Sequence, residues 1–375
     1  MYLTSLFVDG FRNLETITLA PHPRLTVIVG DNGQGKTNLL EAVHLVSALR
    51  PLRQVERANE LVGFGRERGV VRGRFELDGP LDVEVAVEQR GRKATVGGKA
   101  VRDVAILASR LGVVSFVPDD ATIIRGSPGD RRRGLDRFAF SLFPSFASVS
   151  RRFEEALEQR NRLLKEPFVD VDALDAFTPP FVSAAAELTR LRAEACARWA
   201  PVFAAEALAI GGEALAAELE YDSGLLGAVS TTTAVSTDAL QAQLSAKLDA
   251  GRDIERRKKS TLCGPQHDDV LINKAGRKAR FLASQGEARA LVLALKLAGV
   301  RILTDVRGQP PLLLLDDVAG ELDASRAQRL LASIDEHGVQ CFVTTTDVST
   351  LPPLGACRVF EVRAGQVVTT SDGGL

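Results

Sequence analysis

The stretch LTVIVGDNGQGKTN, residues 25–38, decides the fold of this chain. Its first five residues are rich in valine, isoleucine and threonine and predict a short strand over 25–29. The next eight, residues 30–37, match the pattern Gly-x-x-x-x-Gly-Lys-Thr, and a helix is predicted from Thr37 to about Leu49. A strand, a glycine-rich loop and a helix in this order indicate a phosphate-binding loop.

The residue types of this loop suit a nucleoside triphosphate. Glycines let successive backbone N–H groups turn toward an anion, and the following helix adds its positive dipole end. Lys36 is expected to reach the β- and γ-phosphates, and the Thr37 hydroxyl is expected to hold Mg²⁺. An incidental glycine-rich turn is the alternative, which the flanking strand and helix disfavour. The predicted nucleotide-binding residues of the loop are Gly30, Asp31, Asn32, Gly33, Gln34, Gly35, Lys36 and Thr37.

A second stretch, PLLLLDD at residues 311–317, supplies the other half of a nucleotide site. Four consecutive leucines predict a strand buried on both faces, and the carboxyl ends of such strands are where open α/β sheets bind ligands. Asp316 is the predicted metal-side carboxylate, and Asp317 is predicted to orient the attacking water, so Asp317 and Lys36 are the predicted catalytic residues. The alternative is an aspartate pair that caps a helix starting near Asp323.

These halves lie near opposite ends of the chain, which predicts an α/β ATPase fold that is split in sequence. Residues 1–145 form its first part, and residues 256–375 form its second part, with the predicted metal-side strand at 312–317. Helical periodicity between them predicts an inserted, mostly helical lobe at 146–255. In the second part, the segment SQGE at 284–287 opens a long apolar helix with a predicted capping box.

Composition places few limits on function. The 375 residues carry a net charge of −1, and they include four scattered cysteines, which favour reduced thiols over disulfides or zinc. No apolar run approaches the ~18 residues of a membrane span, and the amino terminus lacks a leader, so a cytoplasmic protein is expected. Basic residues gather at 50–74, 131–133 and 252–260. Such clusters are typical of DNA-binding surfaces, although internal ion pairs remain an alternative.

Taken together, these segments resemble the ABC-type ATPase heads of chromosome-maintenance and DNA-repair proteins, and most closely the bacterial recombination mediators among them. The resemblance covers the chain from end to end and in order. It rests on FRN at 11–13, GDNGQGKTNLLEA at 30–42, FVPDD at 116–120, GSPGDRRRGLDRF at 126–138, QRNRLLK at 159–165, GPQHDD at 264–269, SQGEARALVLALKLA at 284–298, LLLLDDVAGELD at 312–323 and TTT at 344–346.

The resemblance implies a mechanism that needs two subunits. In such heads, one ATP lies between the phosphate loop of one subunit and the serine-glycine signature of another. Ser284, Gln285 and Gly286 would therefore contact the γ-phosphate held by a partner, and ATP with Mg²⁺ would join a two-fold homodimer. Arg12 resembles a residue near the phosphates, and residues 320–323 resemble a loop that crosses the interface.

The same resemblance implies a role in DNA replication and recombinational repair. It implies binding to single- and double-stranded DNA at junctions or gaps, partner mediators of the RecO and RecR type that load a recombinase, and no membrane partner. A weak, DNA-stimulated ATPase would reset the dimer. The chain departs from the family at Gln266 and His267, where histidine followed by arginine is usual, and no role is assigned to them. Asp317 is glutamate in most other ABC proteins but is usual in this branch.

Three rival functions are weighed against this one. A transporter ATPase subunit usually has a Gly-Gly-Gln form of signature and a membrane-coupling surface, which the sequence lacks. A coiled-coil repair ATPase needs hundreds of heptad residues, whereas the insertion is short and has no sustained heptads. The third is an ATP-dependent interaction scaffold that does not contact DNA. Only the basic clusters argue against it, so a DNA-binding assay distinguishes it from a DNA-repair ATPase.

Overall fold

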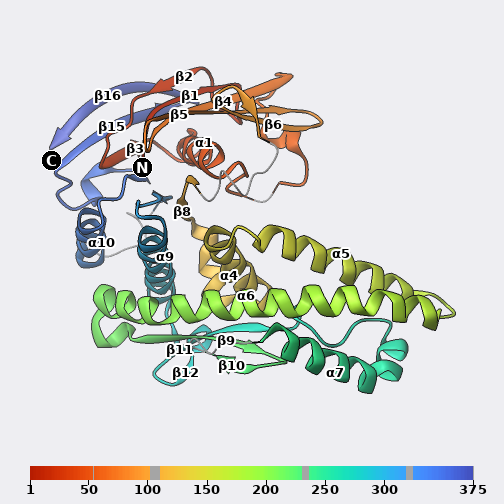
Figure 1. The fold of residues 1–375 in the computed structure, drawn as a ribbon. Coiled ribbons are helices and arrows are strands. Elements are labelled where there is room, and N and C mark those ends of the chain that lie inside the picture. Colours follow the sequence, from red (N-terminus) through yellow and green to blue (C-terminus); the bar gives the residue numbers. More distant parts are fainter. Residues whose placement is uncertain (54, 102–109, 230–235, 318–323, 375) are drawn as a thin grey trace. The chain divides into compact units, whose positions relative to one another are not determined.

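The computed structural model describes residues 1–53, 55–101, 110–229, 236–317 and 324–374 (Figure 1). The chain divides into two compact units, each of which is described by itself. Unit 1 comprises Met1–Asp120, Ala209–Leu215 and Ser284–Leu375, and unit 2 comprises Ala121–Leu208 and Ala216–Ala283. Among the described residues, none of the helices combines the length and apolar character that a membrane span needs.

A mixed six-stranded sheet in unit 1 joins the two ends of the sequence. Its strand order is β16-β15-β3-β14-β13-β8, and β15, β3, β14, β13 and β8 run parallel in it. All four leucines of β13 are fully buried, which confirms the strand predicted to be covered on both faces. The strands are β3 (Leu25–Val29), β8 (Val113–Phe116), β13 (Leu312–Leu315), β14 (Cys341–Thr345), β15 (Ala356–Arg363) and β16 (Gln366–Gly374).

A second six-stranded sheet in unit 1 is antiparallel throughout, in the order β2-β1-β4-β5-β6-β7. Buried and exposed side chains alternate along β4, as expected for a sheet with one solvated face. Strands β1 and β2 at the amino terminus pair with each other antiparallel, with Phe7 opposite Thr18. The strands are β1 (Tyr2–Asp9), β2 (Ile17–Leu19), β4 (Arg68–Glu76), β5 (Pro80–Glu88), β6 (Gly91–Val96) and β7 (Lys99–Ala100).

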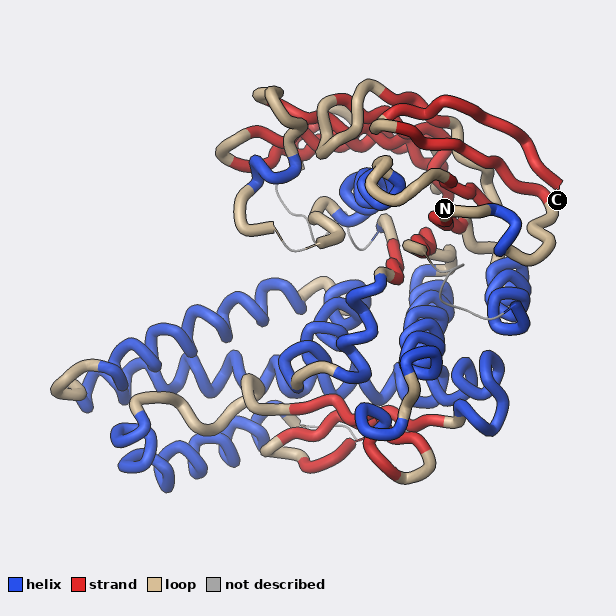
Figure 2. Tube along the Cα trace, turned by 180° about the vertical axis from the view of Figure 1, so that it is seen from behind, coloured by secondary structure: helices blue, strands red, loops and turns tan. Residues whose placement is uncertain are grey.

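Helix α1 (Lys36–Ala48) lies between these two sheets (Figures 1 and 2). Its side chains share one hydrophobic core with residues of both sheets, such as Phe75 and Phe342. Nearly every residue of α1 is buried, because a helix enclosed by two sheets has no solvated face. The remaining helical elements of unit 1 are η1 (Ala58–Leu61), η2 (Pro118–Ala121), η3 (Gly212–Leu215), α9 (Gln285–Arg307), α10 (Ala324–Glu336) and η5 (Val348–Thr350).

Unit 2 is mostly helical, and it also contains a four-stranded sheet in the order β10-β9-β11-β12. Its longest helix, α6, continues through Pro201, and residues 209–211 of this helix are assigned to unit 1. The helices are α3 (Thr122–Arg125), α4 (Pro128–Leu142), α5 (Phe146–Lys165), α6 (Val171–Gly211), α7 (Thr237–Lys258) and α8 (Ala279–Leu282), and the strands are β9 (Ala217–Ser223), β10 (Gly227–Val229), β11 (Asp269–Lys274) and β12 (Arg277–Lys278).

The boundaries of unit 2 differ from those of the predicted insertion at 146–255. Arg131 on α4 is buried, and its Nε and Nη2 donate to the two carboxylate oxygens of Asp269 at 2.7 and 2.8 Å. This ion pair ties α4 to the first residue of β11. Both segments therefore belong to unit 2, and not to the ATPase parts that the sequence places at 1–145 and 256–375.

Candidate nucleotide-binding site

The glycine-rich loop of residues 30–37 follows β3 and leads into α1. A Cβ at Gly30 would lie 2.3 Å from the carbonyl oxygen of Val362, so the close approach of β15 excludes any other residue there. Gly35 has φ 116°, and a Cβ on it would lie 3.0 Å from the side chain of Leu14. Both positions require glycine for steric reasons, as the predicted phosphate-binding loop demands.

Lys36 turns back into this loop. Its side chain is only 7% exposed, and Nζ donates to the carbonyl oxygens of Gly30 at 2.6 Å and of Asp31 at 2.9 Å. An ammonium group has three N–H donors. Two of them donate to these carbonyl oxygens, so the third can donate to a phosphate oxygen. The lysine is thus held inside the loop that is predicted to surround the phosphates.

The two predicted metal-side residues lie together. The Thr37 hydroxyl is 2.9 and 3.0 Å from the two carboxylate oxygens of Asp316 and donates to them. They meet because β3 and β13 flank β14 and all three strands end at the same edge of the sheet. A hydroxyl and a carboxylate are the hard oxygen ligands that Mg²⁺ prefers, so the donor set fits this ion.

Thr344, at the end of β14, completes this arrangement. Its hydroxyl donates to Asp316 at 2.7 Å and accepts a hydrogen bond from the backbone N–H of Asp317 at 2.8 Å. Asp317 has φ 53°, an uncommon conformation for an aspartate, and this hydrogen bond stabilises it. Although Thr344 belongs to a segment that carries the family resemblance, its role was missed, because a threonine within a strand looks like an ordinary β-forming residue.

Burial raises the pKa of the Asp316 carboxyl above its usual value, and the charge of Asp317 acts in the same direction. Hydrogen bonds from Thr344 and Thr37 oppose this effect. A raised pKa means that the protonated form of Asp316 persists to higher pH than that of an exposed aspartate. A metal ion must displace this proton, so metal binding and acidification compete.

We therefore expect the affinity of the ATP-bound protein for Mg²⁺ to fall as pH decreases, by up to about tenfold per pH unit below the pKa of Asp316. Asp316→Asn, which binds no proton at this position, is expected to bind Mg²⁺ weakly and with less dependence on pH. Calorimetry in buffers of different ionisation enthalpy measures the protons released. Equal proton release in the two proteins would contradict a role for Asp316 in metal binding.

Arg12 has partners within the protein. Its Nε and Nη2 donate to the two carboxylate oxygens of Glu41 at 3.0 and 3.3 Å, and its Nη1 donates to the Glu60 carbonyl at 2.9 Å. Glu41 is fully buried, and Arg53 also donates to it at 2.8 Å. A buried carboxylate between two guanidinium groups explains the position of Arg12. Its expected place beside the phosphates stays a prediction.

The Phe11-Arg12-Asn13 segment also supports the loop through Asn13. The amide of Asn13 donates to the Gly33 carbonyl at 3.3 Å and accepts a hydrogen bond from Asn38 at 2.7 Å. On the other side of the loop, the side-chain oxygen of Gln34 accepts a hydrogen bond from the backbone N–H of Ala364 at 2.6 Å. These contacts hold the loop from both sides, a role that spacing in the sequence does not indicate.

The predicted signature turn lies at the amino terminus of α9. Ser284 caps this helix, accepting a hydrogen bond from the Glu287 N–H at 3.2 Å, while the Glu287 carboxylate accepts from the Ser284 N–H at 2.9 Å. The predicted capping box is thus confirmed. Ser284 and Gln285 are exposed, so another molecule can reach them. The resembling interface loop at 320–323 lies outside the described residues.

The unassigned segment Gly264–Asp269 has a role within unit 2. Gln266 donates to the Cys263 carbonyl at 3.1 Å, and His267 Nε2 lies 3.1 Å from the Thr261 carbonyl oxygen. Asp268 is buried, where it accepts hydrogen bonds from the Tyr221 hydroxyl and, at 3.1 Å, from the Gly224 N–H. These contacts make Gln266 and His267 part of a tight turn before β11.

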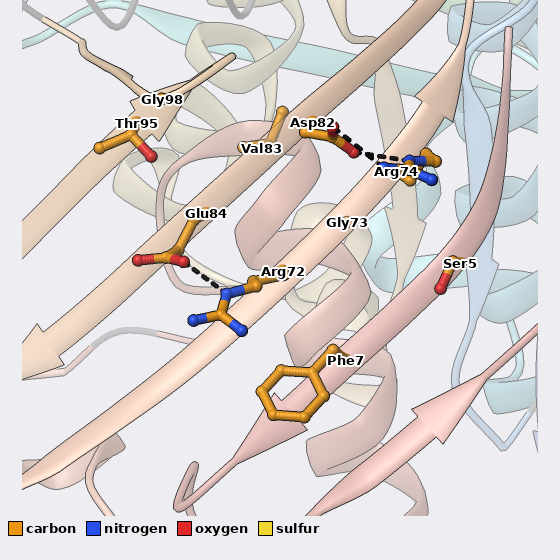
Figure 3. A pocket seen from close by; sticks show the side chains of 10 residues that line it. All are labelled: Ser5, Phe7, Arg72, Gly73, Arg74, Asp82, Val83, Glu84, Thr95 and Gly98. Carbon is orange, nitrogen blue, oxygen red and sulfur yellow. Dashed lines mark hydrogen bonds and ion pairs between the residues drawn. The ribbon is translucent and has the colours of Figure 1, made fainter.

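A separate hollow of about 500 Å³ lies on the antiparallel sheet of unit 1 (Figure 3). Its cations already have partners, because Arg72 pairs with Glu84 at 2.5 Å and Arg74 pairs with Asp82 at 2.7 Å. The Arg72 guanidinium also lies 5.1 Å from the centre of the Phe7 ring. Neutralised guanidinium groups attract phosphate weakly, so this hollow is a poorer nucleotide site than the loop of residues 30–37.

Comparison with known proteins shows which family the chain resembles. The profile of the RecF/RecN/SMC N-terminal domain family matches residues 2–365. The DNA replication and repair protein RecF of Anaeromyxobacter sp. (strain K) is 42% identical over 374 residues, which are 98% of this chain and 99% of the relative. The RecF of Myxococcus xanthus (strain DK1622) is 40% identical over 380 residues, with 99% and 98% covered.

Solved structures show the same fold. The recombination mediator protein RecF–ATPrS of the RecFOR pathway matches with a TM-score of 0.86 and 28% identity, over 98% of this chain and 97% of the other. An Smc head bound to the C-terminal winged-helix domain of ScpA matches with a TM-score of 0.56 and 16% identity, over 100% and 98%, and supports the fold alone. These likenesses confirm the predicted fold class, an ABC-type ATPase head with an inserted, mostly helical lobe.

Proposed function

This chain belongs to the RecF/RecN/SMC family, and on that premise we propose that it is an ATP-dependent DNA-binding protein of replication and recombinational repair. One observation carries the nucleotide part of the proposal. Thr37 at the start of α1, Asp316 just after β13 and Thr344 near the end of β14 are joined by hydrogen bonds, next to the loop that encloses Lys36. A relative of known structure is described as bound to ATP, which supports the same ligand here.

Each residue of this site has a proposed task. Lys36 binds the β- and γ-phosphates, and the backbone N–H groups of the loop surround them. Thr37 and Asp316 hold Mg²⁺, which supplies charge neutralisation at the phosphates. Asp317, whose backbone is fixed by Thr344, orients the attacking water and accepts its proton. Slow hydrolysis by a single aspartate suits a protein whose bound state must last.

We further propose that ATP joins two copies of the chain. Ser284, Gln285 and Gly286 lie at the exposed amino end of α9, where backbone N–H groups and the helix dipole attract an anion. In a two-fold dimer this end would reach the γ-phosphate bound by the partner. If DNA binds across the dimer, thermodynamic linkage requires that ATP tighten DNA binding by the factor by which DNA promotes the ATP-bound dimer.

The basic clusters differ in their availability for DNA. In the cluster 131–133, Arg131 binds Asp269 and Arg132 donates to the Asp268 carbonyl at 2.5 Å, so both stabilise unit 2. In contrast, residues 256–259, two arginines and two lysines at the carboxyl end of α7, are all exposed. We therefore place a DNA phosphate contact at residues 256–259 rather than at 131–133.

Fluorescence anisotropy of a labelled duplex with a single-stranded tail tests this proposal. ATP–Mg²⁺ is expected to tighten binding, and raised salt is expected to weaken it. Arg256→Ala/Lys258→Ala should weaken binding by about tenfold and lower the salt dependence by about two ion equivalents. The control, Arg151→Ala/Arg162→Ala, removes two exposed charges from α5. Equal effects of both variants would refute the contact at α7.

Many basic residues form ion pairs within the chain. This favours a second candidate function, that of an ATP-dependent scaffold without direct DNA contact. Absence of DNA binding at low salt with ATP would support the scaffold and overturn the DNA-binding function. The description of a relative as a mediator of the RecFOR pathway supports partners of the RecO and RecR type in either case. Gapped or junction DNA is the proposed substrate, as the resemblance to the ATPase heads of DNA-repair proteins implies.

A further inference from the structure

The backbone just before the signature turn is held by a side chain from another element of unit 2. Arg125, the last residue of α3, donates from Nη2 to the carbonyl oxygen of Ala283 at 2.6 Å. Ala283 is buried and is joined by its peptide bond to Ser284, the cap of α9. One arginine therefore holds the residue that enters the signature turn.

The peptide unit between Ala283 and Ser284 is held at both ends. Its carbonyl oxygen accepts from Arg125, and its N–H donates to the Glu287 carboxylate at 2.9 Å. A peptide unit is planar, so fixing its oxygen and its N–H fixes the orientation of the whole plane. The direction in which the chain leaves toward Gln285 and Gly286 follows from that orientation.

Arg125 is itself anchored by a buried ion pair. The buried guanidinium of Arg131, which pairs with Asp269, also donates to the Gly126 carbonyl at 2.8 Å. The Ser127 cap of α4 and its capping box with Asp130 fix the same turn. These contacts hold the turn that carries Arg125 against β11, the strand from which the chain continues toward Ala283.

Helix α8 itself provides little support for this segment. It is four residues long, and its side chains Phe281 and Leu282 are 74% and 44% exposed. The Arg280 guanidinium covers the Phe281 ring at 4.4 Å but leaves it in contact with solvent. A short helix with few buried apolar contacts opens easily, so a contact from outside it matters for its position.

We propose that Arg125 is a positioning residue for the signature turn. It orients the Ala283–Ser284 peptide unit so that Ser284, Gln285 and Gly286 meet the γ-phosphate of a partner subunit. The inference rests on the proposed function, because it requires that the signature acts between subunits. It assigns to the Arg125–Ala283 contact a role in ATP-driven dimerisation and none in the binding of ATP to the single chain.

The test separates these two steps with three variants. Arg125→Ala removes the donor. Arg125→Lys keeps a positively charged donor but replaces the branched guanidinium with a single ammonium group. Arg151→Ala removes a comparable exposed arginine from α5. ATP affinity is measured by calorimetry at protein concentrations below dimerisation, and the dimer constant is measured by sedimentation with a slowly hydrolysed ATP analogue. Melting temperatures without nucleotide report on folding.

Arg125→Ala is expected to bind ATP within about twofold of the parent and to dimerise about tenfold more weakly, since the signature turn of each subunit would then have to be ordered when the dimer forms. Arg125→Lys should recover part of this loss, and Arg151→Ala should match the parent. Unchanged dimerisation of Arg125→Ala would overturn the inference, as would a parallel loss of ATP affinity and melting temperature, which indicates a structural role.

Ser284→Arg in the same assay distinguishes the inference from the function on which it rests. If Ser284→Arg fails to dimerise while Arg125→Ala dimerises normally, the inference is wrong and the signature contact stands. If both variants dimerise as the parent does, the contact between subunits is itself wrong and the inference falls with it.

Discussion

Lys36→Ala is expected to lower ATP affinity at least about a hundredfold, which corresponds to roughly 3 kcal/mol. The side chain is buried inside the loop, with its ammonium at hydrogen-bond distance from two backbone carbonyls. Alanine would leave these carbonyl oxygens facing the phosphates without a cation between them. Repulsion between these oxygens and the phosphates then adds to the loss of a charge-assisted hydrogen bond.

Calorimetry with ATP–Mg²⁺ measures this loss directly. ATP should also raise the melting temperature of the parent but not that of Lys36→Ala, because a ligand stabilises only the state that binds it. Asp317→Asn is the contrasting variant, since it should bind ATP normally, form dimers and hydrolyse ATP more slowly. Normal ATP affinity of Lys36→Ala would show that ATP does not bind at this loop. Unchanged turnover of Asp317→Asn would show that Asp317 does not orient the attacking water.

Local patterns in the sequence correctly predict the strands and the helix cap around the candidate site. The strand of residues 25–29, the leucine strand at 312–315 and the capping box at Ser284 are each determined by neighbours within a few positions. Each also agrees with its surroundings in the fold, because a parallel strand covered on both faces is apolar on both, and the capping box satisfies backbone N–H groups at the start of α9. Such elements can be located without any knowledge of the tertiary structure.

Other features depend on partners that are distant in sequence. The Arg131–Asp269 ion pair joins residues 138 positions apart and connects α4 with β11, which both belong to unit 2. Thr344 gains its role only when β14 lies between β3 and β13. Periodicity and charge counts cannot show such pairings, which is why the run at 131–133 looks like a DNA-binding cluster in the sequence although Arg131 is buried.

Ser284→Arg is expected to abolish ATP-driven dimerisation while leaving ATP binding by the single chain unchanged. Arginine provides no oxygen to accept from Glu287, so the cap is lost at a cost of about 1 kcal/mol. Helix α9 spans 23 residues and buries most of its apolar side chains, so it should still form. The larger expected effect is steric, because in the proposed dimer the long side chain would occupy the space of the partner's γ-phosphate.

Ser284→Ala is the matched control, since it removes the same cap without adding bulk. Both variants should bind ATP as the parent does, because the contact proposed for Ser284 is with a nucleotide held by another subunit. With ATP and Mg²⁺, light scattering should show dimers for the parent, weakened dimers for Ser284→Ala and monomers for Ser284→Arg. A Ser284→Arg dimer would refute the contact between subunits, and loss of ATP binding by its monomer would place Ser284 in the chain's own site instead.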